Sequence, residues 1–196
     1  MPCRARSWGA VSLSGVHLLF RTLLHSVLAA LQPSVGAYEV ARARFLVLPT
    51  DLDVFRHMNN GVYLSILDLG RLELLRRSGI WTVFQRNGWY PVVVSETISF
   101  RKSLQLWQRF EVESRILGYD ERAVYVEQRF VREGEIYAQA FVRARILRRT
   151  GGVVPIPELL AQVPPAPADL RVPDWLLQWG EDAALPSTRA EAPSTW

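Results

Sequence analysis

The chain has 196 residues and a formal charge of +4, which arginine carries almost alone because Lys102 is the only lysine. This length is typical of one domain with a substantial core, and an apolar fraction of 49% excludes disorder throughout. A basic chain suits partners with acidic groups. No dense run of arginine with interleaved aromatic residues occurs, so we expect no nucleic-acid partner.

The chain contains a single cysteine, Cys3. One cysteine excludes an internal disulfide and any metal site built from cysteines. The simplest inference is a reducing compartment, so we expect a cytoplasmic protein, either free or peripherally associated with a membrane.

Residues 1–41 form a first section with an amphipathic segment at 16–31. That segment is strongly apolar, but three polar residues recur at every fourth position: His17, Arg21 and His25. On a helix they form one polar stripe, and the apolar runs between them are shorter than the about 20 residues of a membrane span. We therefore expect an amphipathic helix lying on a membrane or on the protein itself. The alternatives are a signal peptide and, for residues 1–15, an over-extended translation start.

Residues 42–163 carry the pattern of the main domain. A strand is expected over 42–49, ended by Pro49, and a helix from Asn59 and Asn60 to the stop signal Gly79. Apolar side chains cover nearly the whole circumference of that helix, which predicts burial on most sides.

Four further strands are expected, over Pro91–Leu104, Phe110–Leu117, Ala123–Arg132 and Ile136–Leu147. The turns between the later ones, GYDE and REGE, are short enough for antiparallel hairpins. A strand, a long helix and a strand meander indicate an α+β fold, in which a sheet curls around one helix. Residues 164–196 form a proline-rich tail, with a short helix at 174–184 expected to dock through Trp175 and Trp179.

A cluster of polar residues lies at the junction of the first strand and the helix: Asp51, Asp53, His57, Asn59 and Asn60. A carboxylate at Asp53 would face the positive end of the helix and could act as a base on water or as a nucleophile. Unpaired first-turn N–H groups near Asn60 and Gly61 suit an oxyanion. His57 could orient the carboxylate, bind the substrate or cap the helix.

A structural explanation competes with the catalytic one, because Asp and Asn before helices are common caps worth about 1 kcal/mol. We favour capping for Asp51 and catalysis for Asp53, His57 and Asn60 together. A metal site is not expected, because Asp53 and His57 have no third ligand at suitable spacing. A glycine-rich phosphate loop and a G-x-S-x-G elbow are also missing from the sequence, so no cofactor and no serine triad are expected.

The run Asp51–Leu64, DLDVFRHMNNGVYL, resembles the D-x-D-x-x-x-H-x-N-N-x-x-Y signature of hotdog-fold acyl-CoA thioesterases in the 4-hydroxybenzoyl-CoA thioesterase superfamily. The likeness covers roughly residues 45–163 and is strongest to bacterial relatives of thioesterase superfamily member six. It extends more distantly to plant acyl-carrier-protein thioesterases. The resemblance implies a hotdog fold, an antiparallel sheet wrapped around one long helix, which agrees with the pattern of elements.

The resemblance also implies roles for single residues. Asp53 matches the catalytic carboxylate, and a backbone amide near Asn60 would polarise the thioester carbonyl. His57 matches the histidine of the plant-type site, and Asn59 and Asn60 match loop positions that shape it. Tyr63 matches a residue that lines or supports the acyl pocket.

The substrate implied by the resemblance is a fatty or aromatic acyl-CoA, or an acyl carrier protein. A homodimer or higher oligomer is implied too, with sites at the subunit interface that strand residues near 96–99 of a second copy complete. Arg101 and Lys102 are candidates for the CoA phosphates, and a solvated strand end is the alternative.

One position departs from the plant-type pattern, because Phe55 stands where those enzymes have an asparagine. No glutamate securely matches their later acidic residue either. We therefore favour a simple mechanism of Asp53 with a backbone amide over a network through His57. The alternative functions are a non-catalytic hotdog acyl-binding or scaffold protein and, less favoured, a hydratase or dehydratase.

Two further groups have structural explanations. Asp68 and Arg71 are three residues apart on the expected helix, which predicts an ion pair. The aromatic residues after the helix are expected in the core, with closure of an acyl tunnel as the alternative: Trp81, Phe84, Trp89 and Tyr90.

Overall fold

The computed structural model describes residues 32–187 and 190–194, so the amphipathic helix expected at 16–31 lies outside the described residues. The elements, in chain order, are β1 (Ala41–Leu46), the 3-10 turn η1 (Pro49–Asp51), α2 (Asn60–Arg77), α3 (Ile80–Asn87), β2 (Trp89–Phe100), β3 (Arg109–Tyr119), β4 (Val124–Arg132), β5 (Glu135–Arg148), α4 (Ile156–Leu160) and α5 (Asp174–Asp182).

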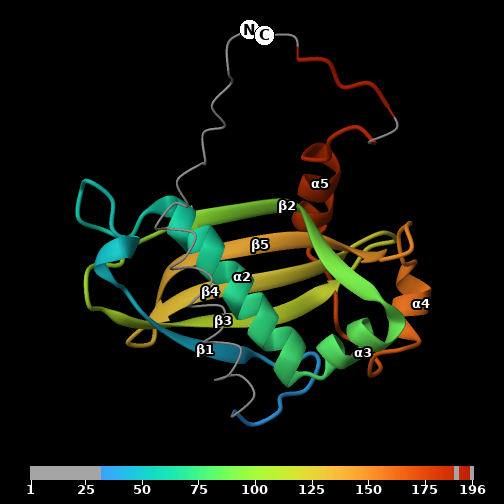
Figure 1. The fold of residues 1–196 in the computed structure, drawn as a ribbon, viewed down its shortest axis with the longest axis horizontal. Coiled ribbons are helices and arrows are strands. Elements are labelled where there is room, and N and C mark those ends of the chain that lie inside the picture. Colours follow the sequence, from blue (N-terminus) through green and yellow to red (C-terminus); the bar gives the residue numbers. More distant parts are fainter. Residues whose placement is uncertain (1–31, 188–189, 195–196) are drawn as a thin grey trace, which may run out of the picture.

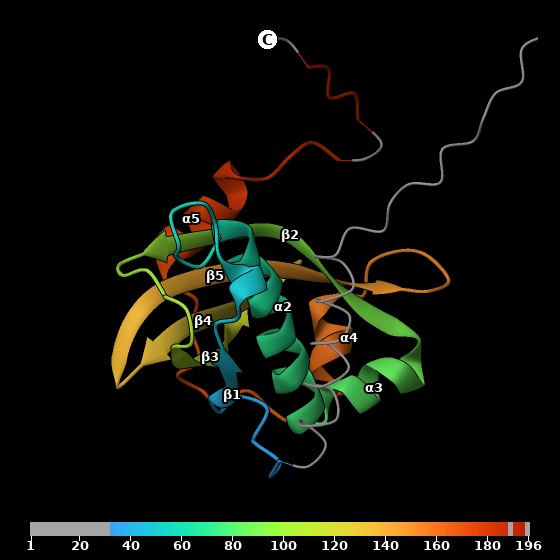
Figure 2. The ribbon, with the colours of Figure 1, turned by 60° about the vertical axis from the view of Figure 1, so that its left-hand side comes forward.

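The five strands form one antiparallel sheet in the order β1-β3-β4-β5-β2. The long helix α2 crosses one face of this sheet (Figures 1 and 2). β1 and β2 are the edge strands, and β2 is the longer, with 12 residues. The expected α+β arrangement of one long helix on an antiparallel sheet is confirmed.

The boundaries of α2 follow from its capping residues. Asn59 caps the N-terminus, because its side-chain oxygen accepts the Gly61 N–H at 2.8 Å. Gly79, with a φ of 77°, follows the C-terminus in the left-handed conformation that glycine adopts without strain. The expected helix is thus confirmed, but α3 begins directly after Gly79, and the sequence pattern did not predict that second helix.

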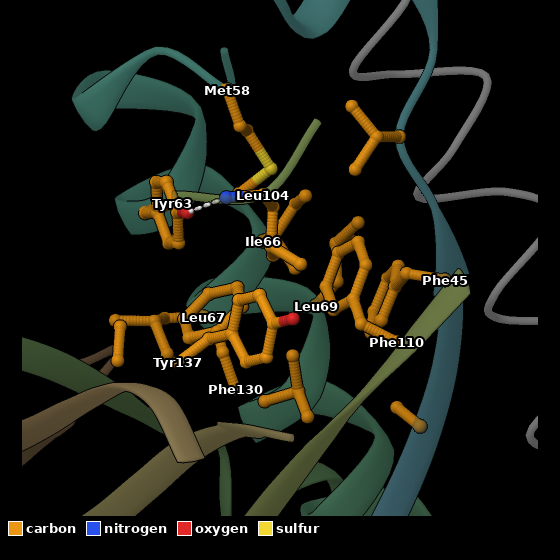
Figure 3. Close-up of a cluster of buried hydrophobic side chains, with 14 of the residues drawn as sticks. Phe45, Met58, Tyr63, Ile66, Leu67, Leu69, Leu104, Phe110, Phe130 and Tyr137 are labelled. Carbon is orange, nitrogen blue, oxygen red and sulfur yellow. Dashed lines mark hydrogen bonds between the residues drawn. The ribbon is translucent and has the colours of Figure 1, made fainter. Parts of the chain in front are cut away.

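A cluster of buried apolar side chains fills the space between α2 and the sheet (Figure 3). Ile66 and Leu67 of α2 are fully buried there. Gly70 lets the helix approach closely, because a Cβ at this position would lie 2.8 Å from Cγ1 of Val112 in β3. That distance is too short for a real contact, so the packing requires glycine in the middle of the helix.

The side of α2 that faces away from the sheet is less enclosed than the sequence pattern predicts. Leu64 is exposed, and Leu72 and Leu75 are half-buried. The sheet of one chain covers only one side of the helix. The apolar positions on the other side are therefore less covered by the part of the chain that the structure describes.

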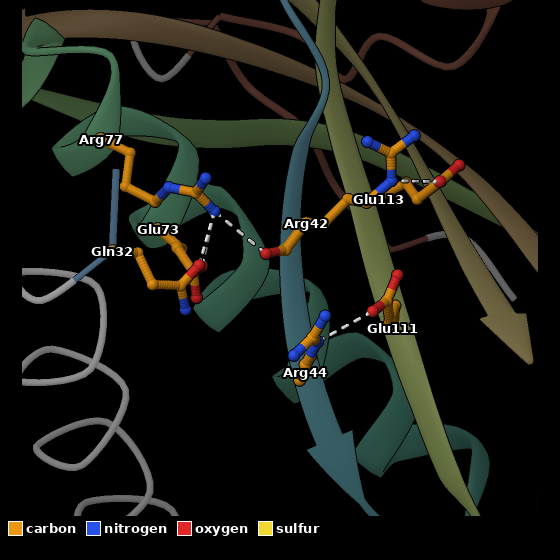
Figure 4. A network of polar contacts seen from close by, with 7 residues as sticks. All are labelled: Gln32, Arg42, Arg44, Glu73, Arg77, Glu111 and Glu113. Atoms are coloured by element: carbon orange, nitrogen blue, oxygen red, sulfur yellow. Dashed lines mark hydrogen bonds and ion pairs between the residues drawn. The ribbon is translucent and has the colours of Figure 1, made fainter. Parts of the chain in front are cut away.

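The last turn of α2 is tied to β1 by a buried polar network (Figure 4). Arg77 donates to Oε1 of Glu73 at 3.1 Å, to Oε1 of Gln32 at 2.9 Å and to the Arg42 carbonyl at 3.0 Å. Burial raises the pKa of Glu73, and the hydrogen bond from Arg77 opposes that rise. The network links the last turn of α2 to the backbone of β1.

The tail returns to the opposite face of the sheet, where α5 covers Leu117 and Tyr125. The short helix expected at 174–184 is confirmed as α5. Its buried anchor is Leu176, whereas Trp175 touches Phe141 edge-on at 5.0 Å and stays 53% exposed. Trp179 also packs against the buried cluster, so both tryptophans contact the body as expected, but Leu176 is the side chain that is fully buried.

Candidate functional site

The polar segment between β1 and α2 folds into a small hairpin. Leu52 and Met58 form an antiparallel bridge, and the Asp53 N–H donates to the His57 carbonyl at 2.9 Å. The Arg56 N–H donates back to the Asp53 carbonyl at 3.1 Å, and Arg56 has a φ of 65°. A turn closed by one left-handed residue is a common short hairpin. It places Asp53 and His57 opposite each other at its base.

One oxygen of the Asp53 carboxylate accepts a hydrogen bond, and the other lies beside the His57 ring. Oδ1 accepts the Phe55 N–H at 2.8 Å, and Oδ2 lies 3.3 Å from Nδ1 of His57. The side chains of Asp53 and His57 are 22% and 40% exposed. The carboxylate is therefore fixed in position and still open to water and to a substrate.

Phe55 lies over the histidine, with its ring stacked on the His57 ring at 5.9 Å between centroids. This is the position where the plant-type pattern has an asparagine. An aromatic ring offers no hydrogen bond to a substrate or to a neighbouring side chain. The geometry therefore agrees with a site in which His57 supports Asp53 rather than reacts.

The start of α2 supplies a backbone donor beside this hairpin. Asn59 uses its side chain to accept the Gly61 N–H, and its own N–H donates to the Asp51 carbonyl at 2.8 Å. Among the described residues, the Asn60 N–H donates no hydrogen bond. The donor expected near Asn60 and Gly61 is thus narrowed to Asn60, at the positive end of the helix.

Asp51 has the structural role that its position predicts. Its side chain is buried, and Oδ2 accepts the Leu48 N–H at 2.8 Å. Asp51 therefore has a capping role, but it caps the 3-10 turn η1, whereas the cap of α2 is Asn59.

Tyr63 connects α2 to the loop after β2 (Figure 3). Its hydroxyl accepts the Leu104 N–H at 2.9 Å, and its ring packs edge-on against Phe100 and Phe130. Burial raises the pKa of Tyr63, and the Leu104 hydrogen bond acts against this. Tyr63 is thus a buried core residue, and its expected role in lining or supporting an acyl pocket remains a prediction.

Arg101 and Lys102 lie at the exposed end of β2. Both pair with Glu135 of β5, at 2.8 and 2.5 Å, and hydrogen bonds from the two cations lower the pKa of Glu135. The Arg101 and Lys102 side chains are exposed to solvent and therefore accessible to a ligand. Their expected contact with CoA phosphates remains a prediction.

Arg71 forms a second polar cluster halfway along α2. It pairs with Asp68, as the spacing predicted, and also with Oε1 of Glu96 at 3.3 Å and Oε1 of Gln128 at 2.7 Å. Burial raises the pKa of Glu96, and the Arg71 charge opposes it. The sequence pattern missed Glu96 and Gln128 as partners, because they come from β2 and β4 and only the fold brings them to the helix.

An apolar cavity of about 240 Å³ lies between the second half of α2, α3 and the sheet. Its lining is almost wholly aliphatic and aromatic and includes Leu75, Trp81, Phe84, Val126 and Ile146, while Asp68 and Arg71 also line it. Arg71 is about 16 Å along the helix from Asn60, at a rise of about 1.5 Å per residue. Within one chain, the cavity and the hairpin thus lie toward opposite ends of α2.

Two further properties concern the part of the chain that the structure describes. It contains no group of three or more His, Cys, Asp or Glu side chains placed to hold a metal ion. None of its helices has the length and hydropathy needed to cross a bilayer.

Comparison with known proteins identifies a family and several relatives of this chain. The sequence model of the family described as the Thioesterase-like superfamily matches residues 47–179. The protein THEM6 of Xenopus laevis is 41% identical over 100 residues, 51% of this chain and 48% of its own length. The Danio rerio THEM6 is 36% identical over 111 residues, 57% of this chain and 54% of its own length. The chain thus spans about half the length of these curated relatives.

Solved structures show the same fold. The probable thioesterase YbaW of Escherichia coli superposes with a TM-score of 0.58 at 22% identity, over 62% of this chain and 94% of its own. The gentisyl-coenzyme A thioesterase BH1999 superposes with a TM-score of 0.56 at 17% identity, over 62% and 99% of the two chains. The expected hotdog architecture is confirmed.

Proposed function

Because the chain belongs to the Thioesterase-like superfamily, we propose that it hydrolyses the thioester bond of an acyl-CoA. One observation carries the proposal. The Asp53 carboxylate is fixed at the base of an exposed hairpin, next to a helix start whose Asn60 N–H has no acceptor among the described residues. A fixed carboxylate with a nearby free amide can activate a nucleophile and stabilise an oxyanion.

The reaction follows from these groups. Asp53 accepts a proton from water, and the water oxygen bonds to the thioester carbon. The Asn60 N–H donates to the oxyanion, the C–S bond then breaks, and the carboxyl proton passes to the leaving thiolate. The products are a free acid and CoA. Direct attack by the Asp53 carboxylate, followed by hydrolysis of the resulting anhydride, uses the same two groups.

We further propose a homodimer that forms through β2. Among the described residues, β2 is a long edge strand with a neighbouring strand on one side only, and its exposed residues include Val93 and Val94. Such an edge favours antiparallel pairing with a second copy. Antiparallel pairing brings the start of one β2 beside the end of the other. The cavity of one copy would then lie near Asp53 of the other, and residues 96–99 of each copy would help complete the site.

The apolar cavity supports an acyl group with few polar atoms, either aliphatic or aromatic. Arg101 and Lys102 would bind the phosphates of CoA, or the acidic surface of an acyl carrier protein. BH1999 is named a gentisyl-coenzyme A thioesterase, so a protein of this fold acts on an aromatic acyl-CoA. At 17% identity this does not decide between an aromatic and an aliphatic acyl group for the present chain.

A substrate panel tests the proposal. The wild-type protein is incubated with short, medium and long aliphatic acyl-CoAs, aromatic acyl-CoAs and an acyl carrier protein, and release of the free thiol is measured. We expect turnover of at least one acyl-CoA. Release from none of them, or hydration of an enoyl-CoA in its place, would contradict the proposal.

A non-catalytic acyl-binding protein is the second candidate. Two observations favour it: both Asp53 oxygens already have partners within the hairpin, and the Phe55 ring covers His57. This candidate predicts saturable acyl-CoA binding without turnover and the same affinity in Asp53→Asn. Turnover that Asp53→Asn abolishes excludes it.

A further inference from the structure

Two neighbouring turns at one end of the molecule expose apolar side chains. Val54 and Phe55, at the tip of the hairpin, are 90% and 74% exposed. Leu106 and Trp107, in the turn 105–108 between β2 and β3, are 37% and 58% exposed. A bridge between His57 and Gln105 joins the two loops. Both lie at the end of the molecule away from α3 and α4 (Figures 1 and 2).

The backbone at Trp107 is in a conformation that the side chain disfavours. The turn is closed by the Gln108 N–H, which donates to the Gln105 carbonyl at 3.1 Å, and Trp107 has a φ of 62°. Glycine or asparagine is usual at such a position. An exposed tryptophan on a strained backbone does not serve the stability of the single chain, so a contact outside the chain is the better explanation.

The same end of the molecule carries an excess of positive charge. Among the described residues, Arg56 and Arg109 pair with no carboxylate. Asp53 is the only carboxylate within residues 53–57 and 105–109, so Arg56 and Arg109 leave these residues with a net charge of +1 when His57 is counted as neutral. Cations near a membrane surface are attracted to anionic headgroups. The charge of this end is therefore complementary to an anionic bilayer.

We propose that this end, defined by residues 53–57 and 105–109, docks on an anionic lipid bilayer. Phe55 and Trp107 enter the interface while Arg56 and Arg109 contact headgroup phosphates. The apolar side chains stand on the tips of separate turns, which suits a deformable lipid layer better than a rigid protein groove, and tryptophan favours the membrane interface. This surface includes Asp53 and His57 of the proposed site, but its contact with lipid does not require turnover, and its residues differ from the segment 16–31. It places Asp53 beside the lipid.

A fluorescent label on the turn tests the contact directly. In the full-length chain with Cys3→Ser, Leu106→Cys is labelled with NBD and mixed with phosphatidylcholine vesicles with or without phosphatidylserine. We expect a blue shift and brighter emission with phosphatidylserine, and no change for the matched label at Trp175→Cys on α5. If the emission of the label at position 106 does not change, the proposal is overturned, even if the chain binds vesicles. An emission change that follows protein concentration and is the same with and without vesicles also overturns the proposal, because the turn then contacts a second copy of the chain.

A double variant measures how much the Phe55 and Trp107 side chains contribute to vesicle partitioning. Phe55→Ser with Trp107→Gly removes both rings, and glycine accepts the φ at position 107, so circular dichroism should remain that of the wild type. We expect vesicle partitioning to weaken by roughly tenfold or more. The control Trp175→Ser removes an exposed tryptophan elsewhere and should partition like the wild type. Equal partitioning of the wild type and the double variant, or equal losses in the double variant and the control, contradicts the proposal.

Discussion

Nδ1 of His57 lies 3.3 Å from Oδ2 of Asp53, across the base of a hairpin only a few residues long. The other carboxylate oxygen accepts the Phe55 N–H, so the hairpin backbone and the imidazole together fix the carboxylate. In the proposed mechanism, His57 is thus a positioning residue, and Asp53 is the group that meets the substrate.

His57→Ala should lower kcat by about tenfold, because it removes the imidazole beside Oδ2 of Asp53 and leaves the hydrogen bond from the Phe55 N–H in place. His57→Gln, which keeps a donor, should lose less. Steady-state CoA release with both variants measures this. A loss for His57→Ala as large as that for Asp53→Asn would mean that the imidazole itself takes part in proton transfer.

Asn60→Pro removes the backbone N–H that would stabilise the oxyanion. Proline is well tolerated at the first position of a helix, and the extended conformation of Asn59 (φ −62°, ψ 137°) suits a residue before proline. We expect kcat to fall by about 10²–10³, with the free energy of unfolding unchanged within about 0.5 kcal/mol. Asn60→Ala keeps the N–H and should retain activity. Equal activity of the two variants would remove the amide from the mechanism.

Gly70→Ala tests the close approach of α2 to the sheet. Replacing glycine by alanine usually stabilises a helix by about 1 kcal/mol. Here the added Cβ would lie 2.8 Å from Val112, so we expect the free energy of unfolding to fall by about 1–3 kcal/mol. Urea denaturation measures it, with Ser65→Ala on the same helix as the control. A stabilised Gly70→Ala would show that the sheet can move away at little cost.

Glu127 should make stability depend on acidic pH. Burial alone would raise the pKa of Glu127, but hydrogen bonds from Arg115, Gln139 and Arg129 outweigh it and lower the pKa below the usual 4.5. The stabilisation is therefore fully present above that usual value and is lost as the pH falls through the lowered pKa. Glu127→Gln should cost about 1–3 kcal/mol at neutral pH.

Urea denaturation at neutral and acidic pH measures this difference. It should shrink on acidification, once the wild-type carboxylate binds its proton. The exposed Glu121→Gln is the control and should follow the wild type at both values. A difference between Glu127→Gln and wild type that persists in acid would point to lost packing rather than to the charge.

The parts of the fold that the sequence pattern predicted are those with strong local signals. The helix to Gly79 and the strand meander have clear periodicity, capping residues and turns, and they formed as expected. α3 and α4 were missed because each is short, and its apolar residues are compatible with a buried strand or loop. Tertiary packing decides the conformation of such segments.

In the candidate site, too, residues with a local signal were predicted and contacts between distant segments were not. Asp53, His57 and Asn60 lie within one short segment, so their residue types and spacing were enough to single them out. The Arg71–Glu96 pair and the neighbouring turns at Phe55 and Trp107 join segments far apart in the chain. One sequence contains no local signal for such contacts. That only one first-turn donor is left open follows from the side-chain geometry of Asn59, which spacing alone does not give.

The most direct measurement is kcat/KM for CoA release by Asp53→Asn on the best acyl-CoA of the panel. The control is Asp174→Asn, which changes a surface carboxylate on α5. We predict a fall of about 10²–10⁴ for Asp53→Asn, with wild-type circular dichroism and wild-type activity in the control. Full activity of Asp53→Asn would contradict the assignment of Asp53 as the reacting carboxylate.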